Sequence, residues 1–312
     1  MISRRALLRL PAGLALTGLG LGAYSVVIEP NFMLDVTRYR ITPKSWPRNL
    51  ALRVAVITDI HACEPWMPPA RIRRIAELAN ALSPDIVVLL GDFSAGTHIV
   101  TGPVMPEQWA EALSVLKAPL GVHAVLGNHD WWHGPLPSDA PDGAEGARRA
   151  LRHMGARVYE NEALRLTKNG QPFWLLGLGD QMADYMGKRL GWRGHDDLGA
   201  TLAAVTDDAP AILMAHEPFV FHRVPDRIAL TLSGHTHGGQ VNLPFVGPIA
   251  AELRYKTTHI YGHHVEGDRH LVISGGLGES ILPVRFMRPP EIVEVIVESA
   301  DVPSLALAAP PI

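Results

Sequence analysis

The chain has 312 residues, a length that suits one large domain or two small ones. Hydrophobic residues make up 47% of it, which is enough for a sizeable core, and the formal net charge is −3 without a long run of one sign. This balance argues against a nucleic-acid partner bound through its phosphate backbone. The single cysteine, Cys63, excludes a disulfide within the chain. Histidine is unusually frequent, with 15 residues.

Residues 1–30 have the pattern of an export signal. Arg4, Arg5 and Arg9 come first, and a long uncharged stretch of Leu, Ala and Gly follows. The segment "SRRALLR" resembles a twin-arginine signal, so we expect the twin-arginine export machinery as a partner. The uncharged stretch is long enough to span a bilayer, and no clean A-x-A cleavage site follows it. We therefore expect a periplasmic or other extracytoplasmic protein, anchored to the cytoplasmic membrane if the segment is retained. The alternative is a basic patch before a buried helix.

The rest of the chain divides into three parts. Residues 31–50 contain Pro43 and Pro47 without a sustained period and are predicted to be a linker. Residues 51–300 alternate short apolar runs with helical patterns, and residues 301–312 are predicted to be a flexible tail. Strands are predicted at 52–58, 85–90, 121–126, 171–179, 211–215 and 228–233, helices at 68–82, 106–118 and 143–155, and an antiparallel end at 270–276 and 291–297. This order predicts an α/β fold of two packed mixed β-sheets flanked by helices.

Five of the predicted strands end on side chains that can bind a metal. Ligands bind at the carboxyl ends of strands in open α/β sheets, so these side chains are expected to meet at one site. The predicted ligands are Asp59, His61, Asp92, Asn128, His216, His235 and His237.

Seven oxygen and imidazole donors are too many for one ion and suit two. Two divalent ions about 3.5–4 Å apart can clamp the attacking and leaving oxygens of an in-line displacement at phosphorus. A carboxylate can bridge them, and His235 and His237, one residue apart, lie on the same face of an extended chain, so each can serve a different ion. The donors favour Mn, Fe or Zn over Ca, and the absence of thiolates argues against a structural zinc site.

In this order, "DIH", "GD", "GNHD", a lone His and "GHTH" resemble the motifs of the calcineurin-like metallophosphoesterase superfamily, over roughly residues 52–298. The resemblance implies a four-layer α/β/β/α sandwich and a phosphoric ester hydrolase. It implies that Asp59, His61 and His237 hold one metal, that Asn128, His216 and His235 hold the other, and that Asp92 bridges. A metal-bridging hydroxide would then attack in line while His129 protonates the leaving oxygen, with Asp130 expected to orient His129.

The second motif, "GDFSAGT", lacks the Asp and Arg of the protein phosphatases of this superfamily. The segments "GHTHGGQVNLPFVGP" and "SGGLGESILPVRFMRPPEIVEV" are similar to its exported or membrane-anchored bacterial branch. That branch includes a twin-arginine-exported cell-wall phosphoesterase and phosphodiesterases related to UDP-2,3-diacylglucosamine pyrophosphatases of lipid A synthesis. The resemblance implies a phosphodiester or pyrophosphate bond, in a small-molecule, lipid-linked or UDP-sugar substrate. Because UDP-2,3-diacylglucosamine is made on the cytoplasmic side, this substrate conflicts with the outward signal.

Several alternatives stay open at the level of sequence. Four side chains that follow the metal motifs could cradle an acyl chain or pack as a satellite core: Trp66, Met67, Trp131 and Trp132. Four cations, Arg254, Lys256, Arg285 and Arg288, could meet a phosphate or be surface charges. The whole chain could also be a non-catalytic metal-binding scaffold, or a cell-wall or membrane binding module on the same fold.

Overall fold

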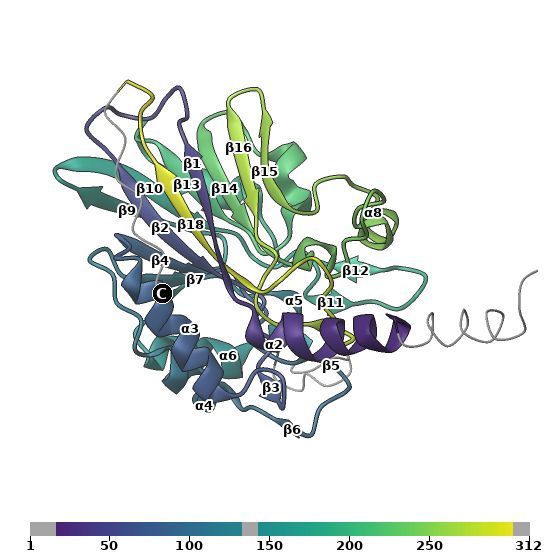
Figure 1. Ribbon diagram of the computed structural model, residues 1–312. Helices are drawn as coiled ribbons and strands as arrows, with labels where there is room; N and C mark the ends of the chain where they lie inside the picture. The colour runs from purple at the N-terminus through teal and green to yellow at the C-terminus, as the bar shows by residue number, and fades with distance from the viewer. Residues whose placement is uncertain (1–16, 133–142, 302–312) are drawn as a thin grey trace, which may run out of the picture.

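The computed structural model describes residues 17–132 and 143–301. Two six-stranded sheets pack face to face, with helices outside them (Figure 1). In spatial order the first sheet contains β1 (Asp35–Ile41), β18 (Glu291–Val297), β2 (Leu52–Ile57), β4 (Ile86–Leu89), β7 (Val122–Ala124) and β8 (Arg157–Val158). The second contains β15 (Gly262–Glu266), β16 (Arg269–Ile273), β14 (Ile228–Ser233), β13 (Ala211–Met214), β10 (Gln171–Gly177) and β9 (Glu162–Lys168).

Strand alternation explains the layers. In β2, Val54 and Val56 point into the core between the two sheets, where Phe173 of the second sheet is also buried. Ala55 and Ile57 point to the opposite face, which the helices cover. The helices on the first sheet are α3 (Pro69–Ala81), α4 (Pro106–Leu113) and α6 (Glu145–His153), and those on the second are α7 (Leu198–Ala203) and η3 (Pro218–Arg223). The predicted fold class is confirmed.

The predicted linker is wrong for residues Asp35–Ile41, which form β1 at the edge of the first sheet. This strand pairs in parallel with β18. The sequence of β1, "DVTRYRI", contains no apolar run. Its charged residues form ion pairs with β18 instead of apolar contacts. Arg38 binds Glu294 at 2.6 Å and Arg40 binds Glu298, and both glutamates are buried. The stabilising partners lie more than 250 residues away, so a local pattern does not show them.

The antiparallel pairing predicted for the last two strands is only partly correct. Strand β16 pairs antiparallel with β15 but parallel with β14. Strand β18 pairs antiparallel with β2 but parallel with β1, in the other sheet. Strands β9 and β15 were not predicted. Three two-stranded ribbons complete the described fold: β3 (Cys63–Glu64) with β6 (Gly102–Pro103), β5 (Gly96–Thr97) with β17 (Ser280–Ile281), and β11 (Asp184–Tyr185) with β12 (Trp192–Arg193).

The N-terminal segment is helical over residues 17–32, which include η1 (Tyr24–Ile28) and α2 (Glu29–Phe32). Among the helices in the described part of the chain, none has both the length and the apolar character required to cross a bilayer. The arginine motif of the predicted signal and the tail after residue 301 lie outside the described residues.

Candidate metal centre

The predicted ligands lie where five strands end. Asp59 and His61 follow β2, Asp92 follows β4, Asn128 begins α5 (Asn128–Trp132) after β7, and His216 follows β13. His235 follows β14, and His237 begins η4 (His237–Gly239). Within each sheet these strands run parallel, so their carboxyl ends share one edge.

Five of these seven residues have left-handed backbone conformations, with φ between 48° and 67°: Asp59, His61, Asp92, His235 and His237. This region costs a non-glycine residue free energy, and such residues concentrate at functional sites. The strain turns consecutive side chains inward from the strand ends. It identifies this edge as the functional one independently of any motif.

The ligands form two buried clusters. Asp59, His61 and His237 make one, and Asp92, His216 and His235 make the other; in each, the offered donor atoms lie within 4.8 Å of one another. In the first cluster, His61 Nε2 is 3.1 Å from His237 Nε2, and His237 Nε2 is 3.5 Å from Asp59 Oδ1. In the second, Asn128 Oδ1 is 2.9 Å from His235 Nδ1, which places the amide beside the cluster.

Asp92 joins the two clusters through one oxygen. Its Oδ2 lies 3.4 Å from His61 Nε2 and 3.4 Å from His216 Nε2. Its other oxygen, Oδ1, accepts a hydrogen bond of 2.9 Å from the backbone N–H of His129. Burial alone would raise the pKa of Asp92, but His216, His129 and His61 hold it well below the ordinary value. An ionised carboxylate therefore faces both clusters, as a bridging ligand requires.

Backbone carbonyls fix the histidine tautomers. The Nδ1–H of His61 donates to the Ser94 carbonyl at 2.8 Å, and the Nδ1–H of His216 donates to the Leu90 carbonyl at 2.6 Å. Because a carbonyl oxygen only accepts, Nδ1 carries the proton in both rings, and Nε2 is the nitrogen that faces the cation site. Burial lowers the pKa of His61 to about 4 and those of His235 and His237 well below the ordinary value, so these three imidazoles are neutral at pH 7.

The donor set fits two divalent cations. His216 Nε2 and His235 Nε2 are buried without a hydrogen-bond partner, an arrangement that a protein interior rarely tolerates. Burial lowers the pKa of His216, but Asp92 and then Glu217 reverse this and raise it well above the ordinary value, which shows how strongly this position favours positive charge. Carboxylate, amide and imidazole donors suit Mn, Fe or Zn.

His129 lies beside the first cluster but is not part of it. Its ring centroid is 4.9 Å from that of His61 and 4.7 Å from that of Trp132, and the residue is 7% exposed. Asp130, expected to orient His129, instead organises the backbone. Its carboxylate accepts hydrogen bonds from the N–H groups of Asp92, Phe93, Ser94 and Gly127. It therefore links the loop after β4 to the loop after β7, and we describe it as a positioning residue.

Comparison with known proteins identifies the family. Residues 52–239 match the model of the calcineurin-like phosphoesterases. The chain belongs to the calcineurin-like phosphoesterase family. It is 29% identical over 310 residues to an uncharacterised metallophosphoesterase, YkuE, of Bacillus subtilis, which covers 96% of this chain and 99% of the relative.

Two further relatives carry more specific names. The UDP-2,3-diacylglucosamine pyrophosphatase LpxG of Chlamydia trachomatis is 28% identical over 310 residues, covering 85% of this chain and 89% of LpxG. The phosphodiesterase YaeI of Escherichia coli is 27% identical over 297 residues, covering 94% of this chain and 98% of YaeI. The predicted family and the assignment as a phosphoesterase are confirmed.

A cavity of about 660 Å³ in the phosphoesterase opens onto the second cluster, at Asp92 and His235. Its floor includes Asp92, Asn128, His129 and His235. Its walls are largely aromatic: Trp132, Tyr185, Trp192, Phe219 and Tyr255. Trp132 stacks on Trp192 with ring centroids 4.6 Å apart, and Trp192 contacts Tyr185 at 4.7 Å. The ribbon β11–β12 thus extends the wall that begins at His129.

The residues proposed to cradle an acyl chain separate in the structure. Trp132 lines the cavity. Met67 is 0% exposed in the core, and Trp131 packs under Arg148, with the guanidinium 4.8 Å from the ring centroid. Trp66 donates its indole N–H to the Ile99 carbonyl. The satellite-core alternative is therefore correct for Met67 and Trp131.

The four candidate cations separate in the same way. Arg254 lines the cavity. Arg285 is fully buried and donates to the carbonyls of Gly275 and Arg288, so it supports the loops and does not reach a substrate. Arg288 lies over the Tyr261 ring at 3.6 Å. Lys256 lines a neighbouring hollow with Phe219 and His259.

Sequence reasoning missed a buried acidic pair behind His216. Asp180 follows β10, a sixth strand end, and Glu217 follows His216 directly. Both are almost fully buried, and burial followed by Glu217 raises the pKa of Asp180 well above its ordinary value. Glu217 accepts from the backbone N–H of Gln181 at 3.0 Å, which ties the loop before the ribbon to the metal centre. The strand-end rule that found the ligands would also have found Asp180.

Replacing Gly127 by alanine should disrupt the centre of the phosphoesterase. An added Cβ would lie 2.6 Å from both the Asp92 backbone nitrogen and His216 Cε1. We expect a loss of about 1–3 kcal/mol in the free energy of unfolding, the usual cost of overpacking, together with reduced metal content. Denaturant unfolding and metal analysis measure both. Gly102→Ala is the control, because its Cβ meets nothing within 4 Å; an equal loss there would contradict the steric explanation.

Proposed function

We propose that the chain is an extracytoplasmic, dinuclear-metal phosphodiesterase or pyrophosphatase. The observation that carries the proposal is the pairing of two buried ligand clusters through Asp92 Oδ2, a residue that lines the same cavity as His129. Asp59, His61 and His237 would hold one divalent ion, and Asn128, His216 and His235 the other. Bound there, two such ions activate both the phosphoryl group and the attacking water as Lewis acids.

The protein's own groups would then position the reacting residues and protonate the leaving oxygen. Asp92 and His129 are buried at the floor of the cavity, and burial strengthens the electrostatic interactions there. His129 lines the cavity beside Asp92 without belonging to either cluster, so its ring would lie where it can give a proton to the leaving oxygen. Asp130 holds the two loops that carry Asp92 and His129 in a fixed relation through backbone hydrogen bonds.

The substrate proposed is a lipid-linked or UDP-sugar phosphodiester or diphosphate. A cavity walled by stacked aromatic rings suits a planar base or an apolar chain beside the phosphate. The relative LpxG is named for UDP-2,3-diacylglucosamine, and YaeI is named a phosphodiesterase. Export by the twin-arginine route, with the body outside the cytoplasm, is proposed from Arg4 and Arg5 and the apolar stretch after Arg9.

Metal removal tests the proposal directly. The chain loaded with Mn is expected to hydrolyse bis-p-nitrophenyl phosphate, to lose this activity when its metal is chelated, and to regain it when Mn is returned. Chelation should also lower Tm, because it removes a metal that binds the folded chain. A ligand at about 100 times its Kd adds about 2.7 kcal/mol to the free energy of unfolding. Turnover is followed by absorbance and unfolding by calorimetry.

The same experiment separates the rival functions. A chain that binds two ions and raises its Tm, but hydrolyses no phosphodiester, UDP-sugar or lipid diphosphate in a panel, would contradict the enzyme proposal. That result would favour the metal-binding scaffold or the cell-wall or membrane binding module.

A further inference from the structure

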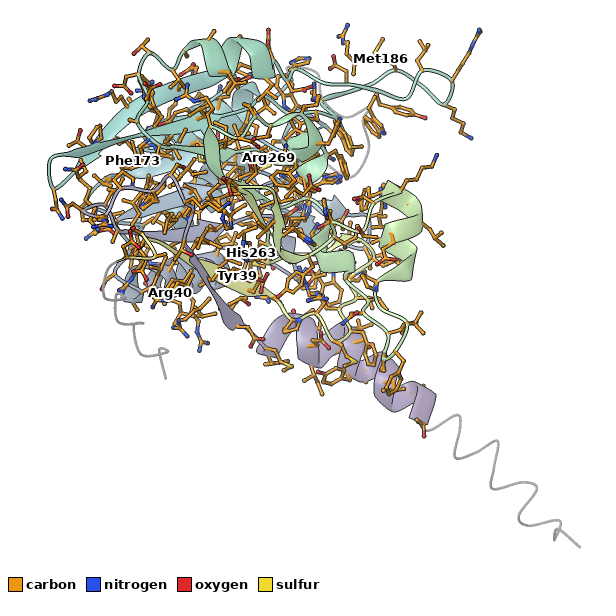
Figure 2. The ribbon with its side chains drawn as sticks, turned by 90° about the horizontal axis from the view of Figure 1, so that it is seen from above. Tyr39, Arg40, Phe173, Met186, His263 and Arg269 are labelled. Atoms are coloured by element: carbon orange, nitrogen blue, oxygen red, sulfur yellow. The ribbon has the colours of Figure 1, made fainter. Side chains whose placement is uncertain are left out.

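Large apolar side chains are exposed on the β11–β12 ribbon, on α8, and on the segment that precedes α8. The turn between β11 and β12 exposes Met186 (44%) and Leu190 (70%). Phe245 is fully exposed before α8 (Ile249–Tyr255), and Leu253 on that helix is 73% exposed. Figures 1 and 2, which share their horizontal axis, show the ribbon, α8 and the N-terminal helix extending to the same side of the molecule, with Met186 on the projecting ribbon. We call Met186, Leu190, Phe245 and Leu253 the apolar rim.

The N-terminal helix has the reverse of the usual amphipathic pattern. Its only charged residue among 17–32, Glu29, is 0% exposed and accepts hydrogen bonds from the backbone N–H groups of Met287 and Arg288. Its outward side chains are apolar and 47–77% exposed: Leu19, Leu21, Val27, Ile28 and Phe32. A helix in contact with water turns its charge outward and its apolar face inward. This helix is arranged for an apolar environment.

Charges beside the apolar rim are mostly positive. The ribbon and its turn, residues 184–193, carry Lys188, Arg189 and Arg193 against Asp184, an excess of two positive charges. Helix α8 and the next residue carry Arg254 and Lys256 against Glu252, an excess of one. A protein of net charge −3 therefore concentrates positive charge around this one apolar surface.

Two of the segments that carry the rim, the β11–β12 ribbon and α8, also line the cavity. Tyr185 and Trp192 flank Met186 and Leu190 in the sequence and line the cavity wall. Arg254 and Tyr255 follow Leu253 and line it as well. A partner in contact with the rim therefore lies at the cavity mouth.

We propose that the apolar rim and the outward face of the N-terminal helix dock the protein on an anionic lipid bilayer, with the cavity mouth toward the lipid. Exposed apolar side chains flanked by Lys and Arg are the composition that binds such an interface. The consequence for catalysis, entry of a lipid-borne phosphoester from the bilayer, rests on the proposed function. The docking itself does not.

The test is sedimentation of the full chain with vesicles of phosphatidylglycerol and phosphatidylcholine. Replacing Met186, Leu190, Phe245 and Leu253 together by serine is expected to lower the vesicle partition coefficient at least about tenfold, because four apolar contacts with the interface are lost. The matched control is Val265→Ser. Val265 is 52% exposed in β15, beside the end of β16 opposite to the carboxyl ends, and should bind as wild type.

Three outcomes would overturn the docking proposal: equal binding by wild type and the fourfold variant, an equal loss with Val265→Ser, or wild-type self-association that the variant loses without any vesicle binding. The last assigns the surface to a second copy of the chain. Turnover of soluble bis-p-nitrophenyl phosphate should be the same in wild type and variant, which shows that the variant is folded. Vesicle binding without turnover by wild type would contradict the proposed function and still support docking.

Discussion

His129→Ala is expected to lower turnover of an alkyl phosphodiester by about 10²–10⁴-fold while the metal content stays unchanged, since this is the usual contribution of a positioned general acid. The ring contacts His61 and Trp132 at the floor of the cavity, yet it is absent from both ligand clusters. Removing it should therefore remove a proton donor and leave the donor atoms in place. Steady-state kinetics and metal analysis of the same preparation measure the two effects.

A comparison of leaving groups tests the role of His129 more specifically. An aryl oxide such as p-nitrophenolate leaves without protonation, so His129→Ala should cost much less on an aryl diester than on an alkyl diester. His98→Ala is the matched control, because His98 lines the same cavity but is exposed. Equal losses on aryl and alkyl substrates, or loss of metal, would contradict the assignment of His129 as the acid.

The ligands could be predicted from sequence because they depend on local patterns. Each of Asp59, Asp92 and His216 follows an apolar strand, and parallel strands bring their carboxyl ends to one edge. Their division into clusters could not be predicted from spacing. His61 and His237 are separated by 176 residues, and only the packing of two sheets places their Nε2 atoms 3.1 Å apart.

Several features that the sequence does not show depend on distant partners. Strand β1 is held by Glu294 and Glu298, and the stack of Trp132 on Trp192 joins α5 to a ribbon of two-residue strands. A strand of two residues has no period to detect. The sequence leaves Arg285 open as a phosphate ligand, because it does not show whether a single arginine is buried. In the structure Arg285 donates hydrogen bonds to backbone carbonyls.

The left-handed backbone at the ligands costs the fold free energy. Each left-handed non-glycine residue costs on the order of 1–3 kcal/mol, and five of the ligands have this conformation. The strands carry these residues, and the Asp130 carboxylate fixes the loop of Asp92 by accepting hydrogen bonds from the backbone N–H groups of Asp92 and Phe93. The surrounding fold therefore offsets the cost of the conformation that the ligands need, and residues held in this way support a precise site.

Asp92→Asn should be the most damaging single ligand substitution, because it weakens both clusters at once. One oxygen, Oδ2, faces His61 in the first cluster and His216 in the second, at 3.4 Å each. An amide keeps the shape but removes the negative charge that offsets two divalent ions. We expect metal analysis to show both ions lost and turnover to fall to the level of the chelated enzyme.

Asp59→Asn is the comparison that makes the bridging role of Asp92 testable. Asp59 belongs to the first cluster, near His237, while Asp92 Oδ2 also reaches the second. Asp59→Asn should therefore lose one ion and retain the other. The two variants change the same chemical group in equally buried sites, so a difference in ion count follows from position alone. If both variants lose a single ion, Asp92 serves one metal only, and the assignment of a shared dinuclear centre is wrong.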